Sequence, residues 1–138
     1  MKKSFSNNKI CDLQSLKHLL KNKKFTLVHG VFDLLHVGHK RHFESAKKLT
    51  NILLVSLTSD RFVKKGPGRP VFNQSLRSEM ISSLDCVTYI YLNDSETPIN
   101  LIKELKPAYY CKGQDYINFS DDITGNIKKE HEAVKKFI

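Results

Sequence analysis

Two histidines, His36 and His39, stand three residues apart with Gly38 between them, just after a glycine-containing turn. If a helix begins here, both imidazoles lie at one end of it, and each can donate a hydrogen bond to a phosphate oxygen. The helix start adds unpaired backbone N–H groups, and Gly38 lets an anion approach the backbone closely. The spacing therefore predicts a phosphate site for phosphoryl or nucleotidyl transfer, which depends on positioning and charge stabilisation.

Other chemistries fit these residues less well. A zinc site at His36 and His39 lacks a third ligand at a suitable spacing. No Gly-Lys-Ser/Thr follows the glycines, so this is not a Walker loop, and the dinucleotide-binding fingerprint is also absent. A lone histidine at a helix start is usually a cap or a surface residue. Here the same turn also contains Gly30, Asp33 and Gly38, which favours a functional role for His36 and His39. His42, one helical turn later, is expected to be structural or at the rim of the site.

The paired histidines need a strand before them and a helix after them. Residues 25–31 form an apolar run that predicts the strand, and residues 39–49 form the helix, with Phe43, Ala46 and Leu49 facing inward. Further strands are expected at 52–57, 86–92 and 108–111.

Helices are expected between these strands and at both ends of the chain. Asp12 and Asn73 are helix caps, and Thr97-Pro98 is a strong helix start. The helix after Asn73 should bury Leu76, Met80 and Leu84, and a last helix should run from about 122 to 136.

Strands that alternate with helices predict an α/β fold, a three-layer parallel sheet with helices on both faces. Ligands of such sheets bind at the carboxyl ends of the strands. The turn after the first strand, the Ser59-Asp60 corner and the polar turn from Lys112 to Tyr116 all follow strands in this way. We therefore expect one site at this edge.

The bulk composition is that of an ordinary globular domain. The chain has 138 residues and a net charge of +9, and its lysines are spread over helix faces and loop tips. This dispersion favours an anionic small-molecule pocket over a nucleic-acid groove. No apolar stretch approaches the ~20 residues of a membrane span, and the N-terminus lacks a signal-peptide core. Three widely spaced cysteines predict a reducing, cytoplasmic setting.

The run from Gly30 to His39 resembles the His-x-Gly-His signature of the nucleotidylyltransferase superfamily, and the similarity extends from about Lys9 to Phe137. The chain most resembles the adenylyltransferase domain of bifunctional ADP-heptose synthases, and next the glycerol-3-phosphate cytidylyltransferases. The features that carry this closer resemblance are Lys65, Arg69-Pro70, Arg77 and the run from Tyr110 to Tyr116.

The resemblance implies a Rossmann-like fold and a reaction between ATP or CTP and a phosphorylated sugar or polyol, such as a heptose 1-phosphate or glycerol 3-phosphate. Pyrophosphate would be released, and Mg²⁺ would be carried by the triphosphate without a direct protein ligand. The activated product would serve the synthesis of a surface polysaccharide. Relatives also suggest a homodimer. Family members usually carry a further strand and a final helix, so residues 1–138 are expected to be one domain that lacks them.

The resemblance also implies roles for particular residues. His36 and His39 would stabilise the transferring α-phosphate and the leaving pyrophosphate, and Asp33 would lie near the acceptor or the metal-bound phosphates. Lys65 would close over the phosphates, with Lys64 as the alternative, and Arg77 would reach the phosphates or the acceptor. The nucleotide-binding set would comprise Gly30, Val31, Phe32, Gly38, His39, Lys112, Gly113, Asp115 and Tyr116.

Simpler interpretations stand beside these roles. Lys65 could be a solvated loop lysine, Arg77 could pair with a nearby acid on its helix face, and Asp115 could start a turn. A domain of this kind could also bind a nucleotide without turning it over.

Overall fold

A four-stranded parallel sheet in the order β3-β2-β1-β4 forms the centre of the molecule. The computed structural model describes residues 8–64 and 66–112. Its elements are α1 Leu13–Leu19, β1 Thr26–Gly30, α2 Val37–Lys47, β2 Leu53–Thr58, the short 3-10 helix η2 Asp60–Phe62, α3 Gln74–Ser82, β3 Tyr89–Asn93, α4 Ile99–Leu105 and β4 Tyr109–Lys112. The predicted last helix, residues 122–136, lies outside the described residues.

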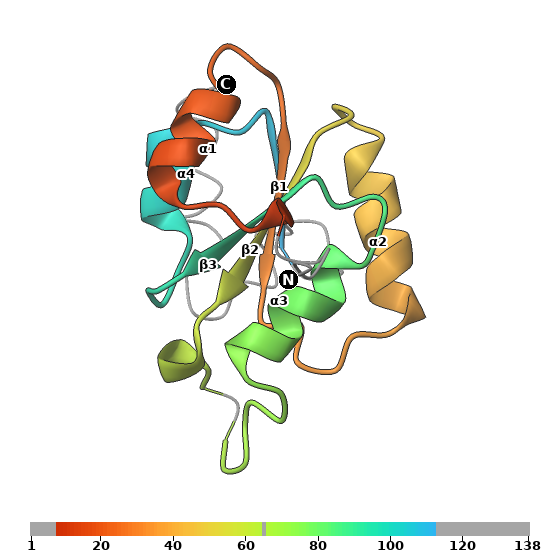
Figure 1. The fold of residues 1–138 in the computed structure, drawn as a ribbon, viewed down its shortest axis with the longest axis vertical. Coiled ribbons are helices and arrows are strands. Elements are labelled where there is room, and N and C mark those ends of the chain that lie inside the picture. Colours follow the sequence, from red (N-terminus) through yellow and green to blue (C-terminus); the bar gives the residue numbers. More distant parts are fainter. Residues whose placement is uncertain (1–7, 65, 113–138) are drawn as a thin grey trace, which may run out of the picture.

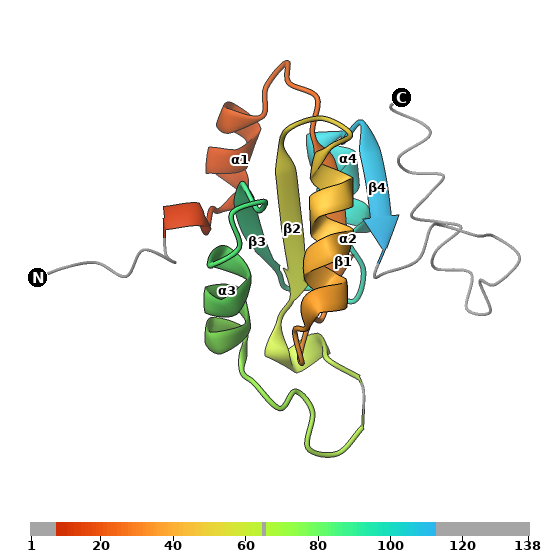
Figure 2. The same cartoon turned by 90° about the vertical axis from the view of Figure 1, so that its right-hand side faces the viewer.

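Helices cover both faces of this sheet, which confirms the three-layer α/β prediction (Figure 1). One core joins α1 and α4 to the sheet through Leu16, Leu27, Leu54 and Ile102. The other core joins α2 and α3 to the opposite face, and its buried residues include Val28, Phe32, Phe43, Val55 and Ile81. Figure 2 shows α2 lying along β1 and β2 on that second face.

The central strands are buried because they are apolar on both sides. All six residues of β2 are buried, as a continuous apolar run predicts. Val28 in β1 lies opposite Val55 in β2 and Cys111 in β4, so the three strands are in register at the middle of the sheet. All four carboxyl ends point to the same edge, which is the lower edge in Figures 1 and 2.

Local sequence explains where several helices begin. The Asp12 carboxylate accepts a hydrogen bond from the Ser15 backbone at the start of α1, and the Asn73 side chain accepts one from Leu76 at the start of α3. These contacts confirm both predicted caps. Thr97 Oγ1 accepts a hydrogen bond from the Ile99 backbone, and α4 begins there, one residue later than expected.

The predicted inner face of α3 is wrong. Leu76 and Met80 are half exposed, whereas Arg77, Ser78, Ile81 and Ser82 are buried. The serines tolerate burial because their hydroxyls donate to helix carbonyls, as from Ser78 to Gln74 at 2.8 Å. Leu49, expected to face inward, also lies exposed after the end of α2.

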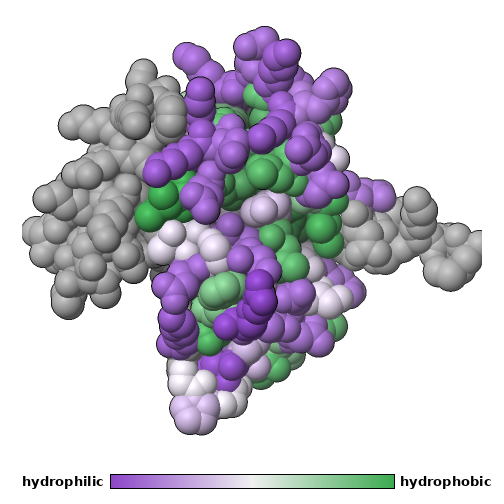
Figure 3. Space-filling view, turned by 90° about the vertical axis from the view of Figure 1, so that its left-hand side faces the viewer, coloured by the Kyte–Doolittle hydropathy of each residue, from purple (hydrophilic) through white to green (hydrophobic). Residues whose placement is uncertain are grey.

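The outward sides of the helices are polar. Seen from the side of α1 and α4, the upper end of the molecule is predominantly hydrophilic (Figure 3). Among the described helices, none has both the length and the apolar character needed to cross a membrane. Cys11, Cys86 and Cys111 are unpaired and partly buried, and burial raises the pKa of each thiol.

Candidate active site

The start of α2 is capped by the two histidines themselves. His36 is the N-cap residue, and its Nδ1 accepts a hydrogen bond from the Gly38 backbone at 2.9 Å. In return, the His36 backbone N–H donates to His39 Nδ1 at 3.1 Å. Ser or Thr paired with Glu or Gln usually makes this reciprocal arrangement. Here imidazoles replace both partners, so the helix start holds the two rings in fixed positions, with their centroids 4.1 Å apart.

These hydrogen bonds determine where each neutral imidazole carries its proton. A backbone N–H can only donate, so Nδ1 of both rings must be the acceptor. The proton of each neutral ring is therefore on Nε2, which becomes a donor.

The turn between β1 and α2 brings Phe32 against His39. Phe32 has a positive φ of 51°, and its ring is buried. The ring meets His39 edge to face at a centroid distance of 5.6 Å, and it meets Phe43 in the same way at 5.0 Å. The predicted nucleotide contact at Phe32 can therefore come from its backbone only, because the core occupies its side chain.

Asp33, predicted to lie near the acceptor or the metal-bound phosphates, makes its hydrogen bonds within the protein. Its side chain is 3% exposed, and its two oxygens accept hydrogen bonds from Arg69 Nη1 at 3.0 Å, from the Val71 backbone at 2.7 Å and from the Phe72 backbone at 2.9 Å. Burial by itself raises the pKa of this carboxyl, but the backbone and Arg69 hydrogen bonds outweigh it, and the pKa is lowered. Asp33 thus anchors the end of the Gly/Pro loop, residues 64–70, to the β1–α2 turn. Its predicted place near the acceptor or the metal-bound phosphates stays a prediction.

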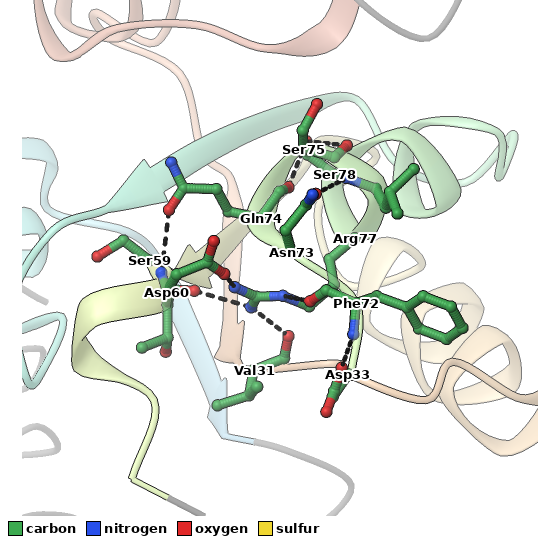
Figure 4. Close-up of polar contacts among 12 residues, drawn as sticks. Val31, Asp33, Ser59, Asp60, Phe72, Asn73, Gln74, Ser75, Arg77 and Ser78 are labelled. Carbon is green, nitrogen blue, oxygen red and sulfur yellow. Dashed lines mark hydrogen bonds and ion pairs between the residues drawn. The ribbon is translucent and has the colours of Figure 1, made fainter. Parts of the chain in front are cut away.

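Arg77, predicted to reach a phosphate, is fully buried. Figure 4 shows its guanidinium among its polar partners, which include Val31, Asp60 and Phe72. Its Nε donates to the Phe72 carbonyl at 2.9 Å, and its Nη1 donates to the carbonyls of Val31 at 2.9 Å and Thr58 at 2.8 Å. Its Nη2 pairs with Asp60 at 2.6 Å. Four of its five N–H groups are therefore bound by the protein, so Arg77 holds the turns around it. Its predicted contact with a phosphate or the acceptor stays a prediction. Asp60 is the nearby acid, but it lies in η2 rather than on the same helix.

A second set of contacts fastens the start of the Gly/Pro loop. Arg61 donates twice to the Asp94 carboxylate, at 2.8 and 2.6 Å, and Ser59 donates to the same group at 2.7 Å. Lys64, the alternative to Lys65, pairs with Glu96. These pairs tie the segment after β2 to the turn after β3, so both ends of the loop are held at the carboxyl edge.

Several predicted site residues meet at this edge, and others lie outside the described residues. Gly30 ends β1, Val31 and Phe32 follow it, and Lys112 ends β4 opposite His29 of β1. The roles expected of Lys65, Gly113, Asp115 and Tyr116 fall outside the described residues. Those roles stay predictions.

Sequence reasoning missed two features. The first is the pairing of Arg69 with Asp33, which has no local sequence signal. Arg69 is named from the sequence only because of the family resemblance. The second is the burial of Arg77, which did have a signal, because Arg77 and Ile81 are four residues apart and so lie on the same, buried face of α3.

A Rossmann-like parallel sheet and a helix start with two imidazoles define a nucleotide-binding α/β protein. The model of the cytidylyltransferase-like family matches residues 27–138, and the chain belongs to that family. The predicted class, a nucleotidyltransferase, is thereby confirmed.

The similar proteins agree with this family. The chain is 43% identical over 112 residues to the bifunctional protein HldE of Helicobacter pylori (strain P12), which covers 80% of this chain and 24% of that protein. It is 44% identical over 118 residues to the bifunctional protein HldE of Campylobacter fetus subsp. fetus (strain 82-40), which covers 83% of this chain and 26% of that protein. The chain thus spans about a quarter of the length of these relatives.

A solved structure shows the same likeness. The lipopolysaccharide core biosynthesis protein from Thermoplasma volcanium GSS1 matches with a TM-score of 0.64 and 27% identity, over 78% of this chain and 88% of that one. The resemblance to HldE-type nucleotidylyltransferase domains is confirmed. The expectations about nucleic acid and cell compartment stay predictions.

Proposed function

We propose that this chain transfers a nucleotidyl group from ATP or CTP to a phosphorylated sugar or polyol in the cytoplasm and releases pyrophosphate. An acceptor phosphate oxygen attacks the α-phosphorus, and the bond from that phosphorus to the bridging oxygen of pyrophosphate breaks. The family, the HldE relatives and the likeness to a lipopolysaccharide core biosynthesis protein support an activated sugar or polyol for surface polysaccharide synthesis.

The observation that carries the proposal is the pair of imidazoles at the start of α2. Their Nδ1 atoms accept backbone N–H groups, so each neutral ring has its donor on Nε2. In the proposed reaction these donors stabilise charge on the α-phosphate and the leaving pyrophosphate, and the positive end of the α2 dipole favours the same anion. Because α2 holds both rings, little reorganisation is needed during transfer.

We propose that magnesium enters the site bound to the nucleotide. Within residues 8–64 and 66–112, no group of three His, Cys, Asp or Glu side chains is arranged to hold a metal. Asp33 is engaged by three donors, and the remaining groups at the helix start are donors suited to phosphate. Bound to triphosphate oxygens, Mg²⁺ would neutralise charge that develops on the leaving group.

The first experiment is a screen of four nucleoside triphosphates against a panel of phosphorylated sugars and polyols, including a heptose 1-phosphate and glycerol 3-phosphate. Pyrophosphate release with one base and one acceptor class is expected, and chelation of magnesium should abolish it. Calorimetry on the same protein measures nucleotide affinity. Tight binding with no product for any pair would favour the alternative function, a nucleotide-binding module without turnover.

The histidines are tested with substitutions that keep the helix capped. His36→Asn keeps a good N-cap acceptor, and His39→Gln keeps a capping-box acceptor at the third helical position. Each variant should fold normally and lose roughly 10²–10³-fold in kcat, as when one preorganised donor is removed. His18→Asn, at an exposed position of α1, is the matched control. Near-normal turnover of both site variants would refute this mechanism.

We also propose that the protein forms a homodimer through an apolar surface beside the site. The half-exposed Leu34, Phe72, Leu76 and Met80 surround a hollow of about 520 Å³ at α3 and the β1–α2 turn. Exposed apolar patches of this kind commonly mark protein contacts, and a two-fold contact pairs such a patch with itself.

A further inference from the structure

We propose that Phe32 is a positioning residue: its buried ring sets the orientation of the His39 imidazole for phosphate transfer. This inference deepens the proposed function and depends on it for the catalytic consequence. It assigns a role to a side chain whose predicted contribution was a nucleotide contact.

The backbone at Phe32 is in a conformation that an aromatic residue rarely adopts. Its φ of 51° lies in the left-handed region, where a bulky L-residue is strained. Such strain persists only where surrounding contacts require it, and it tends to occur at functional sites. The left-handed turn lets the Phe32 ring enter the core while the next residue, Asp33, reaches the Gly/Pro loop.

The contacts of the Phe32 ring indicate why the strained backbone conformation is retained. Phe32 is 6% exposed and lies between two other rings, Phe43 on α2 and the imidazole of His39. Both contacts are nearly perpendicular, at 84° and 87°, which is a favourable geometry for aromatic pairs. Phe43 is buried in the core, so it fixes Phe32, and Phe32 in turn limits the tilt of His39.

A hydrogen bond also restrains the position of the His39 ring. The His36 backbone N–H holds Nδ1 of His39 in place, but a hydrogen bond to one ring atom does not by itself fix the tilt of the ring about it. The edge-to-face contact with Phe32 limits that tilt. The two contacts together aim the Nε2 side of the imidazole.

Gly30 provides independent support, because the structure leaves no room for a side chain there. A Cβ at Gly30 would lie 2.7 Å from Cζ of Phe32 and 3.0–3.1 Å from its Cε atoms. Real Cβ atoms essentially never approach so closely. The last residue of β1 is therefore glycine because the Phe32 ring occupies the space beside it.

The decisive comparison is Phe32→Leu against Phe25→Leu. Both replace a buried phenylalanine, but Phe25 lies in the core on the opposite face of the sheet. Folded Phe32→Leu protein should lose about tenfold to a hundredfold in kcat, as small misplacements of catalytic groups do, with little change in nucleotide KM. Phe25→Leu should keep its kcat. Equal kcat values for the two folded variants would overturn the proposal.

A measurement without turnover separates this proposal from the proposed function. The C–H resonances of the His39 ring, assigned by their loss in His39→Gln, report the neighbouring Phe32 ring. They should shift in Phe32→Leu and in Gly30→Ala, whose Cβ crowds the Cζ end of the Phe32 ring, and should stay unchanged in Phe25→Leu. Unshifted resonances in both site variants would refute the positioning role. If wild-type protein releases no pyrophosphate, the proposed reaction fails, and the resonances alone decide the role of Phe32.

Discussion

Arg77 is the largest fully buried side chain among the described residues, and it carries a charge. Burial of a charge is costly unless hydrogen bonds compensate for it. Arg77 meets this condition by bonding the carbonyls that follow or end two neighbouring strands, Val31 after β1 and Thr58 in β2, together with Phe72 and Asp60. Its role at the carboxyl edge is therefore to hold the turns that form the site.

Arg77→Lys should destabilise the fold rather than change nucleotide affinity. An ammonium group lacks the planar fork of a guanidinium and cannot reach all four partners. Buried carbonyls left without a donor cost roughly 1–3 kcal/mol each, so we expect a loss of about 2–4 kcal/mol in the free energy of unfolding. Urea denaturation measures this loss.

The matched control is Arg61→Lys, because Arg61 is exposed and pairs with Asp94 at the surface. Such pairs contribute about 0–1 kcal/mol. If Arg77→Lys were as stable as Arg61→Lys and instead raised the nucleotide KM, the original expectation of a phosphate contact would be supported.

Asp33 makes the anchoring of the Gly/Pro loop pH-dependent. Its pKa in the fold is lowered, because the Phe72, Val71 and Arg69 donors outweigh the effect of burial. A lowered pKa means that the carboxylate contributes stability at pH values above the pKa of an unfolded aspartate, about 3.9. That contribution is lost as the pH falls through the pKa of the folded state.

Asp33→Asn should therefore be less stable than wild type at neutral pH, and the difference should shrink as the medium becomes acidic. Urea denaturation between about pH 7 and pH 3 measures the difference in unfolding free energy. Asp85→Asn, at an exposed carboxyl, is the control. A constant difference across this range would show that the charge of Asp33 does not anchor the loop.

At the scale of elements, α3 tests which side chains hold a helix to the sheet. Ile81 is fully buried between α3 and the sheet, whereas Met80, one position earlier, is 56% exposed. Ile81→Ala should cost about 2–5 kcal/mol in unfolding free energy, and Met80→Ala should stay within about 0.5 kcal/mol. Thermal or urea denaturation of the two variants measures the contrast, and equal losses would mean that α3 packs through another face.

The same helix shows why the sequence predicted some features and not others. The strands were predictable because apolar runs such as residues 53–58 are buried on both faces. The face of α3 was not, because counting only apolar residues selected Leu76 and Met80 and did not consider Arg77 for the buried side. Its burial depends on carbonyls of β1 and β2, which are distant in sequence.

The start of α2 gives a second example. The sequence placed His36 and His39 correctly at a helix start, because the glycines and the preceding strand are local signals. It treated a histidine cap as the alternative to a functional histidine, whereas in the structure the two imidazoles at the site also cap the helix. It did not predict the left-handed Phe32, whose conformation depends on contacts with Gly30, His39 and Phe43.

At the scale of the whole molecule, strand order locates the site. The chain builds β1, β2 and β3 in one direction and then returns to place β4 on the other side of β1. The direction of winding therefore reverses between β1 and β4, and ligands of such sheets bind at that point. The turn that contains His36 follows β1, and Lys112 ends β4. The reversal therefore brings together segments that are more than 70 residues apart in the sequence.

The apolar surface beside this site leads to a prediction about assembly. Leu76 and Met80 are half exposed, so an isolated domain would present them to water next to Leu34 and Phe72. If they form a two-fold contact, Met80→Glu places like charges on both sides of it and removes apolar contact, which should shift the protein from dimer to monomer. Sedimentation velocity at micromolar concentrations measures the shift.

Leu49→Glu is the matched control for the assembly test, because Leu49 is 49% exposed but lies just beyond the C-terminal end of α2, away from the hollow. Folded monomer stability should change little in either variant, since both side chains are largely in water. Only Met80→Glu should therefore lower the sedimentation coefficient, and only at concentrations where the wild-type protein is dimeric. A wild-type protein that sediments as a monomer at all concentrations would rule out the dimer, and a Met80→Glu protein that remains dimeric would place the contact on another surface.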